Sequence, residues 1–469
     1  MIGQPLETDY LIVGAGAMGM AFADTLLTET DHDIIIVDAH DKPGGHWNDA
    51  YSFVTLHQPS AYYGVSSKEL SRGEIDQKGF NQGLEDLATG AEIKAYFEEV
   101  MRQRFLKSGR VRYLPMHEYD WDTGAARPRL GGEPRPINPS RKIVDSTWLK
   151  TTVPSTHSPN FEVMPDTALR PLNDLPKIAH QYDEFVICGG GKTSMDALLW
   201  LLEHGCDQEK IRWIISRDGW MLDRATTQTQ LQFFEQTMGN QARQMEAIAS
   251  STSVENLFER LEAGGCLVRL DPNITPTMFH GATVSQDELT AMRRVKGVVR
   301  MGHIQKISAS EIVLDRGTIP TTPKTLHIDC TATAAGNTEM VPVFQENKIT
   351  LQTIRIVQPV FSASVIAYIE ANYENDEQKN ALCPVVPLPD MASDWIKVQA
   401  SAMMNQFIWS QDKPLRRWIR DNRLDGYSHM IRNVGEGDTE KLEILNRLRS
   451  ASMDAMGKLQ TYMSELEHA

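Results

Sequence analysis

The sequence predicts an α/β fold with two parallel-sheet domains, and three observations lead to this prediction. Two segments, "DYLIVGAGAMGMAFADTL" from residue 9 and "DEFVICGGGKTSMDALLW" from residue 183, each run from an apolar strand through a glycine turn into a helix. Strand, glycine turn and helix in this order open a parallel α/β unit. The chain of 469 residues is also too long for one compact core.

The first glycine turn has the spacing G-x-G-x-x-G and predicts a dinucleotide site. Gly14 permits a tight turn, Gly16 lets the backbone approach a pyrophosphate, and Gly19 lets the helix pack close to the strand. The phosphates would bind unpaired N–H groups at the helix N-terminus. The next strand, "DIIIVD", ends in Asp38, which can bind both ribose hydroxyls and would repel a 2′-phosphate. The ligand is therefore FAD or NAD, and further contacts are expected from Ala17, Met18 and Ala39.

The residues after Asp38 favour FAD. The segment "DKPGGHWNDAY" contains Gly45, His46 and Trp47 in a G-G-x-W pattern. Together with the glycine fingerprint and Asp38, this pattern resembles the flavin-containing monooxygenases and the Baeyer–Villiger monooxygenases. The resemblance implies that the first site holds FAD and that the G-G-x-W loop lies along the cofactor. A flavin-pocket or substrate-facing loop is expected in "FVTLHQPSAYYGV", with the polar candidates His57, Gln58 and Tyr62.

The second glycine turn predicts an NADP site. The strand that follows it, "IRWIIS", leads into Arg217 in place of an acid. A guanidinium at this point can bind a ribose 2′-phosphate through two parallel hydrogen bonds. A solvated surface arginine is the alternative interpretation, and Lys192 or Arg224 would add a second positive charge. The predicted NADP-binding residues are Gly189, Gly191, Lys192, Thr193, Ser194 (in place of the third glycine) and Arg217.

The order of the segments predicts an FAD domain interrupted by the NADP domain. The strand at 327–334 resembles the one that ends in Ala-Thr-Gly where two-dinucleotide flavoproteins return to their FAD domain, which places Thr333 and Ala334 near FAD. A plain core strand would look similar. The expected boundaries are 1–168 and 325–469 for the FAD domain and 169–324 for the NADP domain, with a helical lid insertion at about 221–292 and a helical C-terminal tail.

One family marker departs from the pattern. Before its second glycine turn the family has F-x-G-x-x-x-H followed by an aromatic residue. His157 and Phe161 match its second half, whereas Thr151 and Val153 replace the Phe and the Gly. This departure weakens the assignment to a named subclass.

The resemblance implies an NADPH-dependent FAD monooxygenase. In such an enzyme NADPH reduces FAD, O₂ adds to the flavin C4a atom, and the hydroperoxide oxygenates a small organic substrate. Two alternatives use the same fold: a single-component flavin-dependent halogenase, and an NADPH-dependent flavoprotein reductase that does not oxygenate. Because the flavin supplies the reactive oxygen, the sequence assigns no catalytic side chain.

Composition excludes several other classes of function. The net charge of −15 argues against nucleic acid and anionic membranes as partners. The five cysteines are scattered without a C-x-x-C pair, which argues against a disulfide reductase and a structural zinc site, and no other metal motif is present. We find no signal peptide or membrane-spanning run and expect a cytoplasmic protein. The sequence is compatible with a homodimer.

Overall fold

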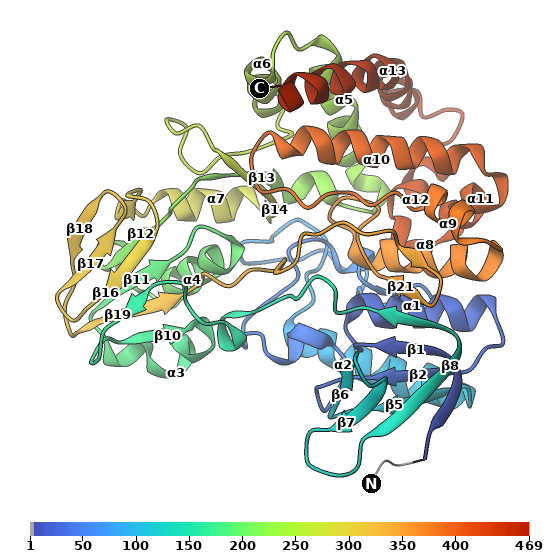
Figure 1. The fold of residues 1–469 in the computed structure, drawn as a ribbon. Helices are drawn as coiled ribbons and strands as arrows, with labels where there is room; N and C mark the ends of the chain where they lie inside the picture. The colour runs from blue at the N-terminus through green and yellow to red at the C-terminus, as the bar shows by residue number, and fades with distance from the viewer. Residues whose placement is uncertain (1–3, 469) are drawn as a thin grey trace.

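The computed structural model describes residues 4–468 and confirms the predicted α/β fold. Two separate sheets lie on opposite sides of the molecule, and a layer of helices covers the space above them (Figure 1). The chain begins beside the first sheet and ends in the helical layer, at the opposite end of the molecule. The two dinucleotide sites predicted from sequence therefore belong to two different sheets.

The first sheet has a parallel centre in which β1 is flanked on both sides. Its strand order is β20-β21-β8-β1-β2-β5, with β6 and β7 attached to β8 as an antiparallel extension. Because β1 is covered on both faces, residues 10–13 are apolar and buried. The helices α1 and α8 pack together on one face. The bounds are β1 (Leu6–Val13), β2 (Ile34–Val37), β5 (Val111–Leu114), β6 (His117–Asp120), β7 (Ala125–Pro128), β8 (Arg135–Asp145), β20 (Phe344–Gln345), β21 (Lys348–Thr350), α1 (Ala17–Glu29), α2 (Gly90–Val100) and α8 (Pro359–Asn372).

The second sheet is entirely parallel, in the order β10-β19-β11-β12-β15. Helix α4 follows β11 directly and contacts α7, while a small sheet in the order β18-β17-β16-β9 packs on the other face through an apolar cluster. The bounds are β9 (Glu162–Val163), β10 (Leu169–Pro171), β11 (Glu184–Cys188), β12 (Ile211–Ile214), β15 (Val298–Val299), β16 (Ile304–Ile307), β17 (Glu311–Leu314), β18 (Gly317–Pro320), β19 (Thr325–Asp329), α3 (Leu175–Ile178), α4 (Lys192–Glu203) and α7 (Gln286–Arg293).

The strand pairing corrects the expected domain boundaries. Strand β19, expected to return to the first domain, pairs with β10 and β11 in the second sheet, and β21 is the strand that returns to pair with β8. Strand β9 already pairs with β16, so the chain leaves the first sheet after β8 and not near residue 168. The physical reason is that the apolar Leu326 and Ile328 suit the interior of either sheet, whereas the buried His327 has partners outside the strand, in Thr321 and the Ala168 carbonyl.

The predicted helical insertion and helical tail are present and share one core. Helix α13 packs on α5 and α10, and an apolar cluster containing Trp220, Phe258 and Trp395 joins the two segments. The remaining elements are β3 (Gly64–Val65), β4 (Lys68–Glu69), β13 (Gly219–Asp223), β14 (Met278–Val284), α5 (Asn240–Ser250), α6 (Val254–Ala263), α9 (Asp376–Leu382), α10 (Asp394–Gln411), α11 (Lys413–Asp421), α12 (Tyr427–Arg432) and α13 (Thr439–His468), with short 3₁₀ and π turns between them. Among residues 4–468, no helix combines the length and the apolar character that a membrane span requires.

Candidate functional site

The three glycines of the first turn have different physical roles. Gly14 has φ +99°, and a Cβ there would lie 2.5 Å from the Ser146 hydroxyl oxygen. A Cβ on Gly19 would collide with the carbonyl oxygen of Gly14, so the fold itself requires both glycines. At Gly16 the nearest atom to an added Cβ is the Gly45 Cα at 3.7 Å, an ordinary contact. Gly16 therefore leaves an open backbone surface beside the G-G-x-W loop.

This open surface has the properties of a phosphate site. Helix α1 begins at Ala17, with Met18 next in its first turn and Gly16 as its N-cap. No side chain within residues 4–468 caps it. Its first N–H groups are thus available to an anion, as at other helix N-termini. The Gly44 N–H donates to the Ala15 carbonyl at 2.8 Å, which holds the two glycine segments together. The residues present fit the pyrophosphate of FAD.

Asp38 lies at the turn as predicted and has a partner that the sequence analysis missed. Its carboxylate accepts hydrogen bonds from the Ala15 N–H at 2.5 Å and the His40 N–H at 2.7 Å. The His40 imidazole lies between the carboxylates of Asp38 (3.0 Å) and Asp49 (2.7 Å). The hydrogen bond with Asp38, together with the one to Asp49, raises the pKa of His40 to about 9. Ala39 is half-buried between them. No motif marked His40 because its role depends on Asp49.

The G-G-x-W loop places an aromatic side chain in the protein interior. Trp47 is buried, and its indole N–H donates a 2.7 Å hydrogen bond to the Tyr63 hydroxyl. The neighbouring His46 side chain is exposed, and its ring centroid lies 5.2 Å from that of Trp47. Gly45 has φ +56°, and a Cβ there would come within 2.9 Å of the Gly16 Cα. The loop is therefore held against the first turn by backbone contact.

The second glycine turn has the same division of roles. Gly189 has φ +128°, and a Cβ there would lie 2.6 Å from the Cys330 carbonyl oxygen. At Gly191 nothing in residues 4–468 lies within 4 Å of an added Cβ, and helix α4 begins directly after it without a side-chain cap. The buried Ser194 donates its hydroxyl to the Gly191 carbonyl at 2.5 Å, which explains how serine replaces the third glycine. Thr193 lies half-buried in the first turn of α4.

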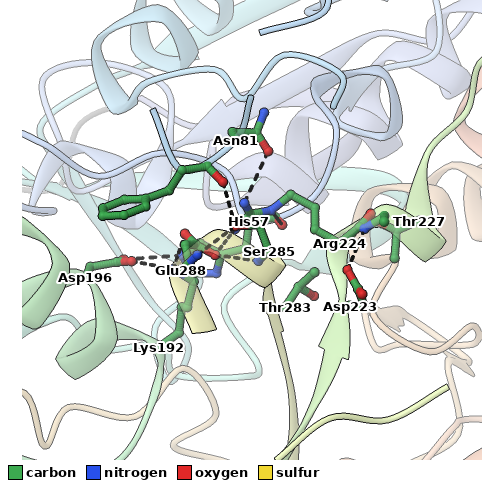
Figure 2. A network of polar contacts seen from close by, with 12 residues as sticks. His57, Asn81, Lys192, Asp196, Asp223, Arg224, Thr227, Thr283, Ser285 and Glu288 are labelled. Atoms are coloured by element: carbon green, nitrogen blue, oxygen red, sulfur yellow. Dashed lines mark hydrogen bonds and ion pairs between the residues drawn. The ribbon is translucent and has the colours of Figure 1, made fainter. Parts of the chain in front are cut away.

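Lys192 is paired with acidic side chains, and its predicted contact with NADP stays a prediction. Its ammonium forms an ion pair with Asp196 one turn later and lies 3.6 Å from the Glu288 carboxylate (Figure 2). Asp196 also accepts a 2.6 Å hydrogen bond from the Tyr51 hydroxyl, and the His57 Nε2 atom lies 3.5 Å away. Although burial opposes its ionisation, the charge of Lys192 and the nearby His57 imidazole hold the pKa of Asp196 well below its usual range.

Arg224 is excluded from coenzyme binding, because it is 1% exposed and engaged at all three nitrogens. Its side chain donates to the His57 carbonyl at 2.9 Å, to Asn81 at 3.2 Å and to Glu288 at 2.7 Å (Figure 2). Sequence reasoning could not distinguish this buried arginine from a phosphate ligand. We call the group formed by His57, Lys192, Asp196, Arg224 and Glu288 the interdomain cluster, since it joins the flavin-pocket loop, α4 and α7.

Only part of the flavin-pocket loop reaches the interdomain cluster. The His57 side chain is 37% accessible, so it is only partly enclosed by the interdomain cluster. Gln58 is half-buried beside it. Tyr62 lies instead in the core, where its ring packs 5.8 Å from that of Tyr427. A Cβ on Gly426 would collide with the Tyr62 ring, which confirms how tightly this contact is packed.

Thr333 and Ala334 lie where the chain crosses between the two sheets. The Thr333 carbonyl accepts hydrogen bonds from the Thr152 N–H and hydroxyl, both at 3.0 Å. The Ala334 carbonyl accepts from the Thr151 hydroxyl at 2.8 Å. These bonds hold the two crossing segments side by side, and both predicted residues are exposed. Their predicted contact with FAD stays a prediction.

Arg217 completes the predicted set and lies next to the second turn. A Cβ added to Gly190 would lie 3.3 Å from the Arg217 carbonyl oxygen. The Arg217 guanidinium forms two hydrogen bonds with the Asp390 carboxylate, at 2.9 and 2.6 Å. Within residues 4–468 there is no group of three histidine, cysteine or acidic side chains arranged to hold a metal ion.

Comparisons with known proteins agree with this geometry. A family model described as an NAD(P)-binding Rossmann-like domain matches residues 12–65, which contain the first turn and the G-G-x-W loop. The polycyclic ketone monooxygenase of the thermophilic fungus Thermothelomyces thermophila shares the fold, with a TM-score of 0.53 and 12% identity over 97% of this chain and 90% of that chain.

Two mycobacterial proteins are much more similar in sequence. Uncharacterized protein Rv2000 of Mycobacterium tuberculosis is 46% identical over 420 residues, which cover 90% of this chain and 78% of the relative. Uncharacterized protein Mb2023 of Mycobacterium bovis matches with the same identity and coverage. The chain therefore belongs to the family that these mycobacterial proteins represent.

Proposed function

We propose that this protein is an FAD-dependent monooxygenase that takes its electrons from NADPH and oxygenates a small organic substrate. The observation that carries the proposal is the hydrogen bond from Tyr51 to Asp196, at 2.6 Å. Tyr51 follows the G-G-x-W loop of the first site, and Asp196 lies in the helix that begins at the second glycine turn. The two candidate dinucleotide sites are therefore in direct contact, as hydride transfer between two cofactors requires.

The donor sets of the two sites support different cofactors. At the first site Asp38 is a carboxylate at the end of β2, which suits a free ribose 2′-hydroxyl and thus FAD. At the second site Arg217 lies two residues beyond Ile215, the equivalent of Asp38, and its guanidinium suits the 2′-phosphate of NADPH. FAD, when bound, would accept a hydride and supply the centre that reacts with O₂.

The role left to the protein is to orient the cofactors and to exclude water. The Tyr63 hydroxyl accepts the hydrogen bond of the buried Trp47 indole N–H, which therefore needs no water molecule as a partner. A dry pocket favours transfer of oxygen to substrate over its loss as hydrogen peroxide. The fold shared with a polycyclic ketone monooxygenase supports the same assignment.

The cysteines do not favour use as a disulfide reductase. All five thiols are free, and burial raises the pKa of Cys188 and Cys330 beside the second turn. A thiol with a raised pKa is a poor nucleophile near neutral pH. The experiment below distinguishes a monooxygenase from a reductase that passes its electrons to an acceptor other than a disulfide.

The test begins with the cofactor released from the denatured protein, which should be FAD. The protein is then reduced with NADPH without oxygen and mixed with air, while the oxidised-flavin spectrum and hydrogen peroxide are followed. A delayed return of that spectrum, with little peroxide, supports the monooxygenase. Immediate return with one peroxide for each NADPH would support a reductase or oxidase instead. The same protein reduced by light without NADPH serves as the control for coenzyme-dependent protection.

A further inference from the structure

The side chain of Arg217, in the coenzyme site proposed above, has a pairing that the proposed function does not explain. Gly190 packs against the end of β12, since an added Cβ would lie 3.0 Å from an Ile215 methyl carbon and 3.3 Å from the Arg217 carbonyl oxygen. In a parallel dinucleotide-binding sheet, the ribose of the adenosine half lies at this point, beside the glycine turn and the end of the second strand. Arg217 is therefore at the right place for a 2′-phosphate.

The guanidinium of Arg217 already has an anionic partner. Its Nη1 and Nη2 atoms donate to the two oxygens of Asp390 at 2.9 and 2.6 Å, in the bidentate arrangement that a phosphate would also adopt. The His280 Nε2 atom lies 3.0 Å from the same carboxylate. The hydrogen bond from Arg217, followed by that from His280, lowers the pKa of Asp390 to about 2, so the carboxylate is ionised near neutral pH.

A neighbouring arginine is paired in a different way. Arg300, just after β15, donates two hydrogen bonds to the Asp218 carboxylate, at 2.8 and 3.0 Å. The Asp218 side chain is 7% exposed, whereas that of Asp390 is 57% exposed. Separating a buried ion pair is costly, but an exposed pair contributes little and exchanges readily. An incoming phosphate would thus displace Asp390 from Arg217 and leave the Arg300–Asp218 pair intact.

We propose that Asp390 is a specificity-determining residue of the coenzyme site, which occupies the position on Arg217 that the 2′-phosphate of NADPH would take. The inference rests on the proposed function, because it requires an NADPH site at the second turn. Coenzyme with a 2′-phosphate must displace the carboxylate, whereas coenzyme without one binds beside the intact ion pair. Asp390 thereby reduces the preference for NADPH over NADH that Arg217 alone would give.

The position of Asp390 also connects this exchange to the helical layer. Its N–H and that of Met391 donate to the Asp394 carboxylate, at 3.0 and 2.8 Å, at the start of α10. Its carbonyl accepts from the Phe279 N–H of β14 at 3.1 Å. The main chain of residue 390 is therefore fixed by bonds that do not involve its carboxylate. Replacing only the side-chain charge should leave this segment in place.

The experiment measures the affinity of the flavin-loaded protein for 2′,5′-ADP and for 5′-ADP by calorimetry. The first probe carries the 2′-phosphate and the second lacks it. Asp390→Asn should bind 2′,5′-ADP about fivefold more tightly than the unmodified protein, the upper range for an exposed ion pair, with unchanged affinity for 5′-ADP. Glu246→Gln is the matched control, because Glu246 forms a bidentate pair with Arg447 at 2.8 and 2.9 Å elsewhere on the surface.

Three outcomes would overturn the inference, and they are distinguishable. If Asp390→Asn leaves the affinity for 2′,5′-ADP unchanged while Arg217→Ala lowers it, Asp390 does not compete and the proposed NADPH site stands. If Asp390→Asn weakens both probes, the carboxylate has a structural role. If the unmodified protein and Arg217→Ala bind both probes equally, the NADPH site itself is refuted. Asp390→Ser repeats the test should the asparagine variant fold poorly.

Discussion

The Tyr51 hydroxyl and the Asp196 carboxylate, joined by a 2.6 Å hydrogen bond, connect the segment after the first glycine turn to the helix after the second. A ring contact between Phe53 and Trp200, with centroids 5.5 Å apart, lies on the same two segments. The relative position of the two candidate sites is thus fixed by side chains of the sites' own elements. This relative position therefore does not depend only on the two segments that cross between the sheets, at residues 151–152 and 333–334.

Removal of the Tyr51 hydroxyl should therefore weaken the fold. Tyr51→Phe leaves Asp196 with one hydrogen bond fewer, and a hydrogen bond to a charged group contributes about 1.5–3 kcal/mol. We expect the free energy of unfolding, measured with urea, to fall by roughly that amount. Tyr113→Phe is the control, because the buried Tyr113 hydroxyl has no hydrogen-bond partner among residues 4–468. An equal loss in both variants would contradict the assigned role of the bond.

The two open glycines provide a pair of variants that control for each other. Gly16→Val and Gly191→Val should both fold, because the nearest atom to an added Cβ is 3.7 Å away at Gly16 and none lies within 4 Å at Gly191 among residues 4–468. The valine methyl groups would fill the space of a pyrophosphate in each case. We expect Gly16→Val to be colourless, and Gly191→Val to keep FAD but resist reduction by NADPH. Flavin absorbance and anaerobic reduction measure both effects. A yellow Gly16→Val protein would remove FAD from the first site.

Arg224 should contribute to stability and not to coenzyme binding. Arg224→Ala leaves Glu288 buried without this partner, and loss of one member of a buried ion pair costs about 3–5 kcal/mol. The matched variant Arg447→Ala removes an ion pair with Glu246 in which both side chains are 40% exposed. It should cost at most about 1 kcal/mol. Urea unfolding of both variants measures the difference, and similar losses would show that Arg224 is not a buried anchor.

The pair of Asp38 and His40 predicts a pH dependence of stability. Because the folded protein raises the pKa of His40 from 6.5 to about 9, protonated His40 stabilises the fold fully below pH 6.5. This contribution, roughly 3 kcal/mol from the size of the shift, is lost as the pH rises through about 9. Urea unfolding should show this decline for the unmodified protein and not for His40→Gln. A decline of the same size in both proteins would assign it to other groups.

The local units were predictable because their signals lie close together in the chain. Strand, glycine turn and helix at both sites follow from residues that are neighbours in sequence, and Gly14, Gly19 and Gly189 are glycines for reasons of backbone geometry that any such turn imposes. Asp38 at the end of β2 was predictable for the same reason. The distant partners of charged side chains were not, as the contacts of Lys192 and Arg224 with Glu288 show.

By itself, the sequence determined that the chain forms two parallel α/β units, each with a glycine turn before its first helix, and that helices follow the second unit. Only the tertiary structure decided which sheet β19 joins, because its apolar residues suit either interior. It also decided that Arg224 is buried and that Arg217 faces Asp390, 173 positions away in the chain. Contacts over such separations depend on how the domains pack, and no local pattern of residue types specifies that packing.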